Sequence, residues 1–223
     1  MKPRYYSNIY WHFTGGPTSK RNGIVWHHFT NLKDVKKNSE LRKPKDAMNN
    51  LKSIIESNVL KATCTELISN KVETKKFCSV CDIPLVDLMY HKTYYGEYAI
   101  GFNAKQIHDH FHPVLYLDPS YTTITSSKEE DDSLDGHKLW DVIGIHKENP
   151  LLNFIKITNF ALDYDHSFYG EREWRCLEDF NFKKNDVEAI IVPKEEVEEM
   201  NEYLVQNGYH NISVMSWNLI ENI

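Results

Sequence analysis

The sequence contains no long hydrophobic run. A membrane-spanning helix needs roughly 18 or more consecutive apolar residues, and no stretch of this chain approaches that length. The N-terminus reads MKPRYY, and the apolar run that a signal peptide requires does not follow it. We therefore expect a cytoplasmic protein that does not associate with a membrane.

Glycine is scarce, with nine residues in a chain of 223. The Gly-x-Ser-x-Gly turn of serine hydrolases is absent, as are the Walker-type and Gly-x-Gly-x-x-Gly loops that hold phosphates. The doublet Gly15-Gly16 has no following lysine or helix pattern, so it predicts a turn. A cysteine nucleophile paired with histidine has no local motif in its favour. The sequence therefore offers none of the common nucleophile or phosphate-loop patterns.

The chain also lacks an excess of positive charge, because 26 basic residues face 32 acidic ones and the net charge is −6. A field of this sign repels polyanions and argues against a general nucleic-acid-binding surface. Two short basic stretches, Lys33–Lys37 and Arg42-Lys43, are the exceptions. Runs of this kind are usually solvated faces. Nucleic-acid binding through them is a third hypothesis, behind the two developed below.

Four cysteines are too few for a disulfide scaffold in a chain of this length, so free thiols are expected. A zinc site would have to combine Cys78-x-x-Cys81 with the imidazoles of His108–His112. Structural zinc sites usually show two regular ligand pairs, and only one is present here. If residues 78 to 81 form a strand, the two thiols also point apart. We therefore expect no metal.

The remaining composition is that of an ordinary globular protein, with 41% hydrophobic and 26% charged residues. We expect one domain over residues 1–223, with a long loop at 17–44 and an acidic excursion at 118–137. Hydrophobic periodicity predicts helices at 45–62, 85–94, 103–111 and 194–207. It predicts strands at 8–14, 77–80, 97–102, 114–117, 151–157, 168–176, 187–192 and 212–217.

These elements do not alternate as regular βαβ units, which favours an α+β fold. We expect a split sheet, mixed or antiparallel, with flanking helices. The strands at 151–157 and 168–176 are predicted to pair with each other. The strand at 8–14 alternates between two faces and is predicted to be half-buried, with its polar face carrying His12 and Thr14.

The segment Tyr169–Arg175 places two carboxylates two residues apart in a predicted strand. Glu171 and Glu173 would share one face, and Arg172 and Trp174 the other. Spacing alone favours an exposed sheet face on which the glutamates form ion pairs with neighbouring arginines. Surface ion pairs of this kind add little to stability. The alternative is a paired-acid surface that holds a cationic or sugar-bearing ligand.

Taken with the acid pair, the segment YWHFT at residues 10–14 resembles a known arrangement. ADP-ribosyltransferases of the split-sheet fold use a histidine or arginine on an early strand, an aromatic that stacks on nicotinamide, and a glutamate late in the chain. His12 looks like the early-strand residue, and Glu171-x-Glu173 looks like the paired-glutamate form of the late motif. The resemblance implies an ADP-ribosyltransferase-like fold and NAD as the ligand.

The same resemblance implies roles for single residues. Glu173 would hydrogen-bond the ribose 2′-hydroxyl and offset developing positive charge, and Glu171 would position the acceptor. His12 and Thr14 would bind NAD, with His12 orienting the adenosine ribose. An aromatic side chain, Tyr95 or Tyr98, would stack on the nicotinamide. The competing interpretation is a hydrogen-bonded strand histidine and tyrosines that pack in the core.

Longer fragments extend over most of the chain, from the strand of His12 to about residue 176. They are FC at 77–78, CDIPL at 81–85, His91, YGEYAIGF at 95–102, PVLY at 113–116 and YGEREWR at 169–175. Together these fragments resemble the AbiGi abortive phage resistance family. The resemblance implies a bacterial antiphage role, and the family's antitoxin label points to a two-gene system without naming a chemistry.

Two hypotheses follow. The first is an NAD-dependent, ADP-ribosyltransferase-like toxin or effector of phage defence. The second is a non-enzymatic antitoxin or sensor that binds a protein partner encoded nearby, through the long loop or the acidic excursion. The first requires that His12 and Glu173 share one cleft.

Overall fold

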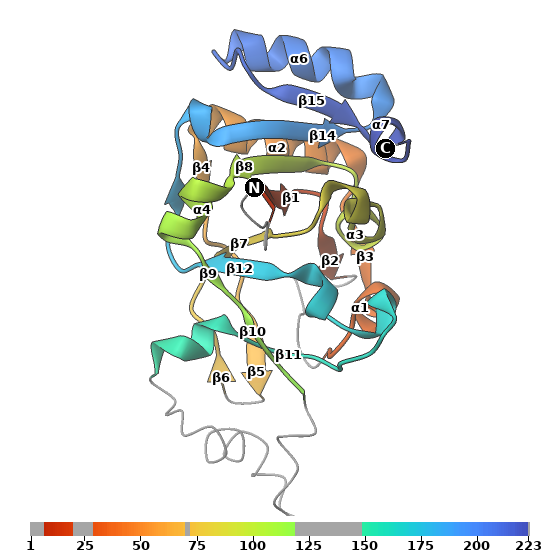
Figure 1. Cartoon of the computed structure of the whole chain (residues 1–223), viewed down its shortest axis with the longest axis vertical. Helices are drawn as coiled ribbons and strands as arrows, with labels where there is room; N and C mark the ends of the chain where they lie inside the picture. The colour runs from red at the N-terminus through yellow and green to blue at the C-terminus, as the bar shows by residue number, and fades with distance from the viewer. Residues whose placement is uncertain (1–6, 20–28, 70–71, 119–148, 223) are drawn as a thin grey trace, which may run out of the picture.

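The computed structural model describes residues 7–19, 29–69, 72–118 and 149–222. At its centre lies a seven-stranded sheet in the order β15-β14-β8-β1-β7-β12-β9 (Figure 1). Neighbouring strands are antiparallel except β14 and β15, which run parallel. The strands are β1 (Ile9–Phe13), β7 (Cys78–Cys81), β8 (Ala99–Asn103), β9 (His112–Pro113), β12 (Glu173–Cys176), β14 (Val187–Val192) and β15 (Ser213–Ser216).

Helices cover both faces of this sheet. One face packs against α2 (Pro44–Ser57), α4 (Ala104–His110) and α6 (Val197–Gln206), and the other against α3 (Leu88–Tyr95) and α7 (Trp217–Ile220). Because side chains alternate along a strand, neighbours such as Ile190 and Ile191 enter different cores. Helix α2 begins with a proline in its first turn and buries a stripe of residues at helical spacing, Ala47, Met48, Leu51 and Ile55.

Four short two-stranded sheets surround the main sheet. The pair β10 (Leu115–Leu117) and β11 (Ile155–Ile157) is parallel, and it lies with β5 (Leu67–Ser69) and β6 (Val72–Glu73) at the end opposite α6 (Figure 1). The others pair β4 (Val59–Leu60) with β13 (Phe180–Asn181), and β2 (Pro17–Ser19) with β3 (Ser39–Leu41). Helix α1 (Leu32–Asn38) precedes β3.

The prediction of a mixed sheet with flanking helices is confirmed, and most predicted elements occur within a few residues of their expected positions. The first strand departs from the predicted half-buried pattern at Tyr10, which was expected on the polar face but is 0% exposed in the core on the α2 side, whereas His12 on the same face is partly exposed. The predicted loop at 17–44 contains β2, α1 and β3, although residues 20–28 lie outside the described part. The acidic excursion lies outside it as well, except for Asp118.

Three further predictions were wrong. The segment at 151–157 begins as a 3₁₀ helix, Pro150–Phe154, and becomes a strand only at Ile155. That strand pairs with β10, not with the segment at 168–176. The latter is a strand only from Glu173 onward.

Within the ranges described here, no helix has both the length and the apolar composition needed to cross a membrane.

Candidate functional site

A cavity of about 390 Å³ lies between α2, β1, β7 and the start of β12. This volume falls within the roughly 300–1,000 Å³ typical of small-molecule sites. The cavity is lined by five of the six side chains predicted to form a site, namely His12, Thr14, Tyr95, Glu171 and Glu173. Strand β7 separates β1 from β12 in the sheet, so residues distant in sequence meet around one strand.

The acid pair is buried, not exposed on a sheet face as spacing suggested. Glu171 is 3% exposed and Glu173 is 9% exposed. The two also do not belong to one strand, because Glu171 ends a 3₁₀ turn (Tyr169–Glu171) and Arg172 has a left-handed φ of 45°. This turn brings the two carboxylates together. The Arg172 side chain points elsewhere, and its guanidinium donates to Asp82 Oδ2 at 2.8 Å.

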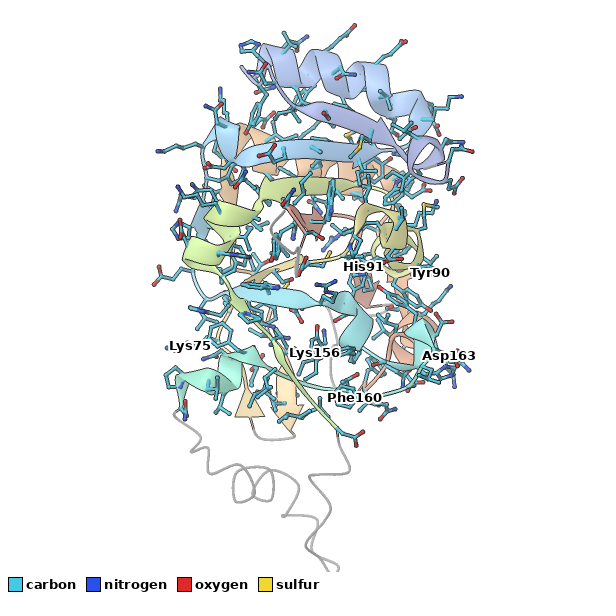
Figure 2. The ribbon with its side chains drawn as sticks, viewed as in Figure 1. Lys75, Tyr90, His91, Lys156, Phe160 and Asp163 are labelled. Atoms are coloured by element: carbon cyan, nitrogen blue, oxygen red, sulfur yellow. The ribbon has the colours of Figure 1, made fainter. Side chains whose placement is uncertain are left out.

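Lys156 on β11 binds both carboxylates. Its Nζ lies 2.6 Å from Glu171 Oε2, 3.2 Å from Glu173 Oε2 and 3.9 Å from Glu66 Oε1. The ammonium also lies 4.5 Å from the centre of the Phe168 ring. Figure 2 shows Lys156 below β12, in the region of the β10–β11 pair. Sequence reasoning missed Lys156 because no local pattern indicates which distant lysine will meet a buried acid.

Arg175 completes the network and is fully buried. Its Nε and one terminal nitrogen donate to the two oxygens of Glu173 at 2.9 and 3.0 Å, and it also binds Glu66. A further nitrogen donates to the carbonyl of Asn153 at 3.0 Å. Its guanidinium carbon lies 4.2 Å from the centre of the Phe77 ring. Three carboxylates therefore face two cations beside the cavity.

The two glutamates differ in their tendency to ionise. Burial opposes ionisation of Glu173, but Arg175 and Lys156 more than offset it and lower the pKa of Glu173 to about 2. For Glu171, burial raises the pKa and the Glu173 carboxylate adds to the rise, against the opposing effect of Lys156. Glu173 is therefore a fixed anion at neutral pH, and Glu171 is the acid that holds a proton more readily.

His12 is a neutral imidazole at neutral pH, because burial lowers its pKa. Its Nδ1–H donates to the carbonyl of Ser79 on β7 at 2.8 Å. This hydrogen bond assigns the tautomer in which Nε2 is an acceptor. The predicted hydrogen-bonded strand histidine and the predicted pocket residue are thus the same side chain.

Tyr95 ends α3 and forms one wall of the cavity. Its hydroxyl donates to Glu171, and its ring stacks on His91 with centroids 4.2 Å apart. Burial and the Glu171 carboxylate raise the pKa of Tyr95, so the phenol stays protonated. Gly16 lies beside this ring: a methyl group in its place would come 3.6 Å from Tyr95 Cδ1.

Thr14 and Tyr98 differ from the prediction in opposite ways. Thr14 lines the cavity, but its hydroxyl donates to the carbonyl of Ala47 on α2 at 2.8 Å. Tyr98 does not line the cavity, because it packs in the core and its hydroxyl donates to Glu196 at 2.9 Å. The turn at Gly96, with φ 83°, separates the two tyrosines that the sequence places three residues apart.

The cysteines and histidines considered as zinc ligands lie in core packing and in aromatic contacts. Cys78 packs in the core on the α2 side and Cys81 in the core on the α3 side. His108 stacks on Trp174 with centroids 5.0 Å apart and lies 2.7 Å from the Tyr10 hydroxyl. Among the residues placed by the structure, no group of three or more histidine, cysteine, aspartate or glutamate side chains is arranged to hold a metal.

Comparison with known proteins identifies a family. No curated protein and no solved structure matches the chain. A sequence model of the family described as "Putative abortive phage resistance protein AbiGi, antitoxin" matches residues 57–217, well over half of the chain. The matched range contains the whole buried network of Glu66, Lys156, Glu171, Glu173 and Arg175. The chain belongs to the AbiGi family, which is associated with abortive phage resistance.

Proposed function

We propose that this AbiGi-family protein acts in phage resistance as an ADP-ribosyltransferase-like enzyme that binds NAD in the cavity. The observation that supports the proposal is the convergence of His12, Tyr95, Glu171 and Glu173 on one cavity. A neutral imidazole, an aromatic wall and a fixed carboxylate suit a ligand that carries a ribose and a cationic ring. NAD supplies an activated glycosidic bond when bound.

In the proposed reaction the bond between nicotinamide and ribose C1′ breaks, and a nucleophile of the acceptor bonds to C1′. Nicotinamide and a proton leave. Glu173 would accept a hydrogen bond from the ribose 2′-hydroxyl and offset the positive charge that develops, a contact stronger in the transition state than in the ground state. Arg175 and Lys156 use three of its about four acceptor positions. Glu173 therefore keeps capacity for one further donor.

The other side chains of the cavity would bind NAD and orient the acceptor. His12 Nε2 would accept a hydrogen bond from a ribose hydroxyl, since its Nδ1 is already committed to Ser79. Tyr95 would present its ring to the nicotinamide beside Gly16, where no side chain intervenes. Glu171 would orient the acceptor and receive its proton, because burial raises the pKa of this carboxyl.

Substitution of Gly16 tests whether NAD occupies the space beside Tyr95. Gly16→Leu should lower NAD affinity at least tenfold in isothermal titration calorimetry, because the added side chain fills the cavity beside the ring. Gly16→Ala is the matched control and should bind as the wild type does, since one methyl group makes only ordinary contact there. Equal affinity for all three proteins, or no NAD binding by the wild type, would count against the proposal.

A second candidate function is binding of a protein partner without catalysis, as the family's antitoxin label suggests. The supporting observation is an exposed apolar surface, here named the Phe160 surface, formed by Phe160 (53% exposed), Leu162 (fully exposed) and Tyr169 (59% exposed). The Phe160 and Tyr169 rings lie 5.5 Å apart, and Figure 2 shows Phe160 in the lower part of the molecule. Aromatic anchors of this kind often dominate protein interfaces.

Co-purification with the product of the neighbouring gene tests this candidate. Phe160→Ser should reduce recovery of the partner at least tenfold if the Phe160 surface is the contact. Val205→Ser, at an exposed apolar residue on α6, is the control and should leave recovery unchanged. If partner recovery and phage protection both survive Glu173→Gln, the binding role is favoured over the enzymatic one. Unchanged recovery with Phe160→Ser would remove this surface from consideration.

A further inference from the structure

Two thiols face each other across neighbouring strands at the edge of the cavity. Strands β7 and β12 are antiparallel, and Cys78 lies directly opposite Cys176. Directly opposed residues in such pairs have Cα atoms about 4.5–5.5 Å apart, within the roughly 4.4–6.8 Å range that disulfides span. The Cys78 thiol donates to the carbonyl of Glu178, two residues beyond Cys176, at 3.5 Å. The backbone register therefore allows a covalent bond between the two residues.

The two thiols differ in access and in acidity. Cys78 is 2% exposed, whereas Cys176 ends β12 and is partly exposed. The neighbouring Cys78 thiol lowers the pKa of Cys176 to about 7, against the opposing effect of burial. Cys176 is therefore the thiol of the pair that ionises more readily. An accessible thiolate beside a buried second thiol is the arrangement of a peroxide-reactive cysteine and its resolving partner.

We propose that Cys176 and Cys78 form a peroxide-sensitive pair that closes to a disulfide. The Cys176 thiolate attacks the O–O bond of a hydroperoxide and becomes a sulfenic acid, and the other oxygen leaves as hydroxide or alkoxide. The Cys78 sulfur then attacks the sulfenic sulfur, and the S–S bond forms as water is released. Two thiols are oxidised by two electrons, and the peroxide is reduced to water or to an alcohol and water.

The other two cysteines have surroundings that do not favour this reaction. Burial raises the pKa of Cys64 and of Cys81, and the neighbouring Cys176 and burial raise that of Cys78, so Cys176 is the thiol suited to attack the peroxide. Cys81 also packs in the core on the opposite face of the sheet. The bond would tie β7 to the strand that carries Glu173 and Arg175, close to the cavity that Cys78 lines. The proposal does not depend on the cavity's ligand, because it concerns the covalent state of two thiols.

Peptide mass spectrometry of the full chain tests the pair. After treatment with hydrogen peroxide and alkylation of remaining thiols, we expect a linked peptide pair containing Cys78 and Cys176 that dithiothreitol separates. Cys176→Ser should abolish the link, and Cys81→Ser should leave it unchanged. In Cys78→Ser, Cys176 should proceed to sulfinic acid instead. Alkylation of Cys176 in the untreated protein should rise with a midpoint near pH 7.

Three results would overturn the proposal. One is oxidation of Cys176 to sulfinic acid by peroxide in the wild type, with no disulfide to Cys78. Another is a link between Cys176 and Cys64. The third is a Cys176 that resists peroxide at neutral pH. If Cys78→Ser does not fold, Cys176→Ser still decides the question, because its partly exposed position tolerates a hydroxyl.

Discussion

Arg175→Met should lower the free energy of unfolding by about 3–5 kcal/mol, the cost typical of breaking a buried ion pair by removing one partner. Arg175 is fully buried and binds both Glu66 and Glu173. Methionine fills part of the volume but leaves the three carboxylates of Glu66, Glu171 and Glu173 facing the single cation of Lys156. Urea denaturation of the two proteins measures the difference.

Two further variants make this result specific. Lys52→Met breaks the exposed pair of Lys52 and Glu199, which are 2.7 Å apart, and should cost no more than about 1 kcal/mol. Adding Glu66→Gln to Arg175→Met removes the charge of one of the two carboxylates that lose Arg175, so the double variant should be more stable than Arg175→Met alone. If Arg175→Met costs no more than Lys52→Met, the buried network does not stabilise the fold.

Glu173→Gln should reduce the release of nicotinamide from NAD by about 100-fold or more, the loss typical of removing one electrostatic contact to a transition state. The amide keeps the shape of the side chain but carries no negative charge to offset the charge developing on the ribose. The fold should survive, because Arg175 keeps Glu66 and Lys156 keeps Glu171. Nicotinamide release and phage plating efficiency measure the two consequences.

Glu66→Gln is the matched control for this experiment. It removes one negative charge from the same network and also lines the cavity, but it lies outside the acid pair. Turnover should therefore fall much less than in Glu173→Gln. Intact NAD turnover and intact phage protection in Glu173→Gln would rule out the enzymatic proposal. Equal losses in both variants would indicate a general effect of charge on the cavity.

Much of the fold could be predicted from local patterns. The strand at 187–192 is confirmed because a short apolar run suits a strand that is buried on both faces. Helix α2 is confirmed because its apolar spacing matches the helical period. The very short strands, β4 to β6 among them, were missed because two or three residues show no period. The start of β12 was misplaced because a left-handed arginine is rare and its sequence gives no warning.

Some residues of the candidate site could likewise be predicted from the sequence, and others could not. His12, Glu171 and Glu173 could be singled out from the sequence through the resemblance of two short motifs to those of ADP-ribosyltransferases, whereas spacing alone favoured an exposed acid pair. Only the tertiary structure decided that the acids are buried, and that Lys156, Arg175 and Glu66 surround them. The physical reason is that a charge is tolerated inside a protein only where a partner meets it. Glu66 lies 109 residues from Arg175, and only packing of the whole chain determines that such partners meet.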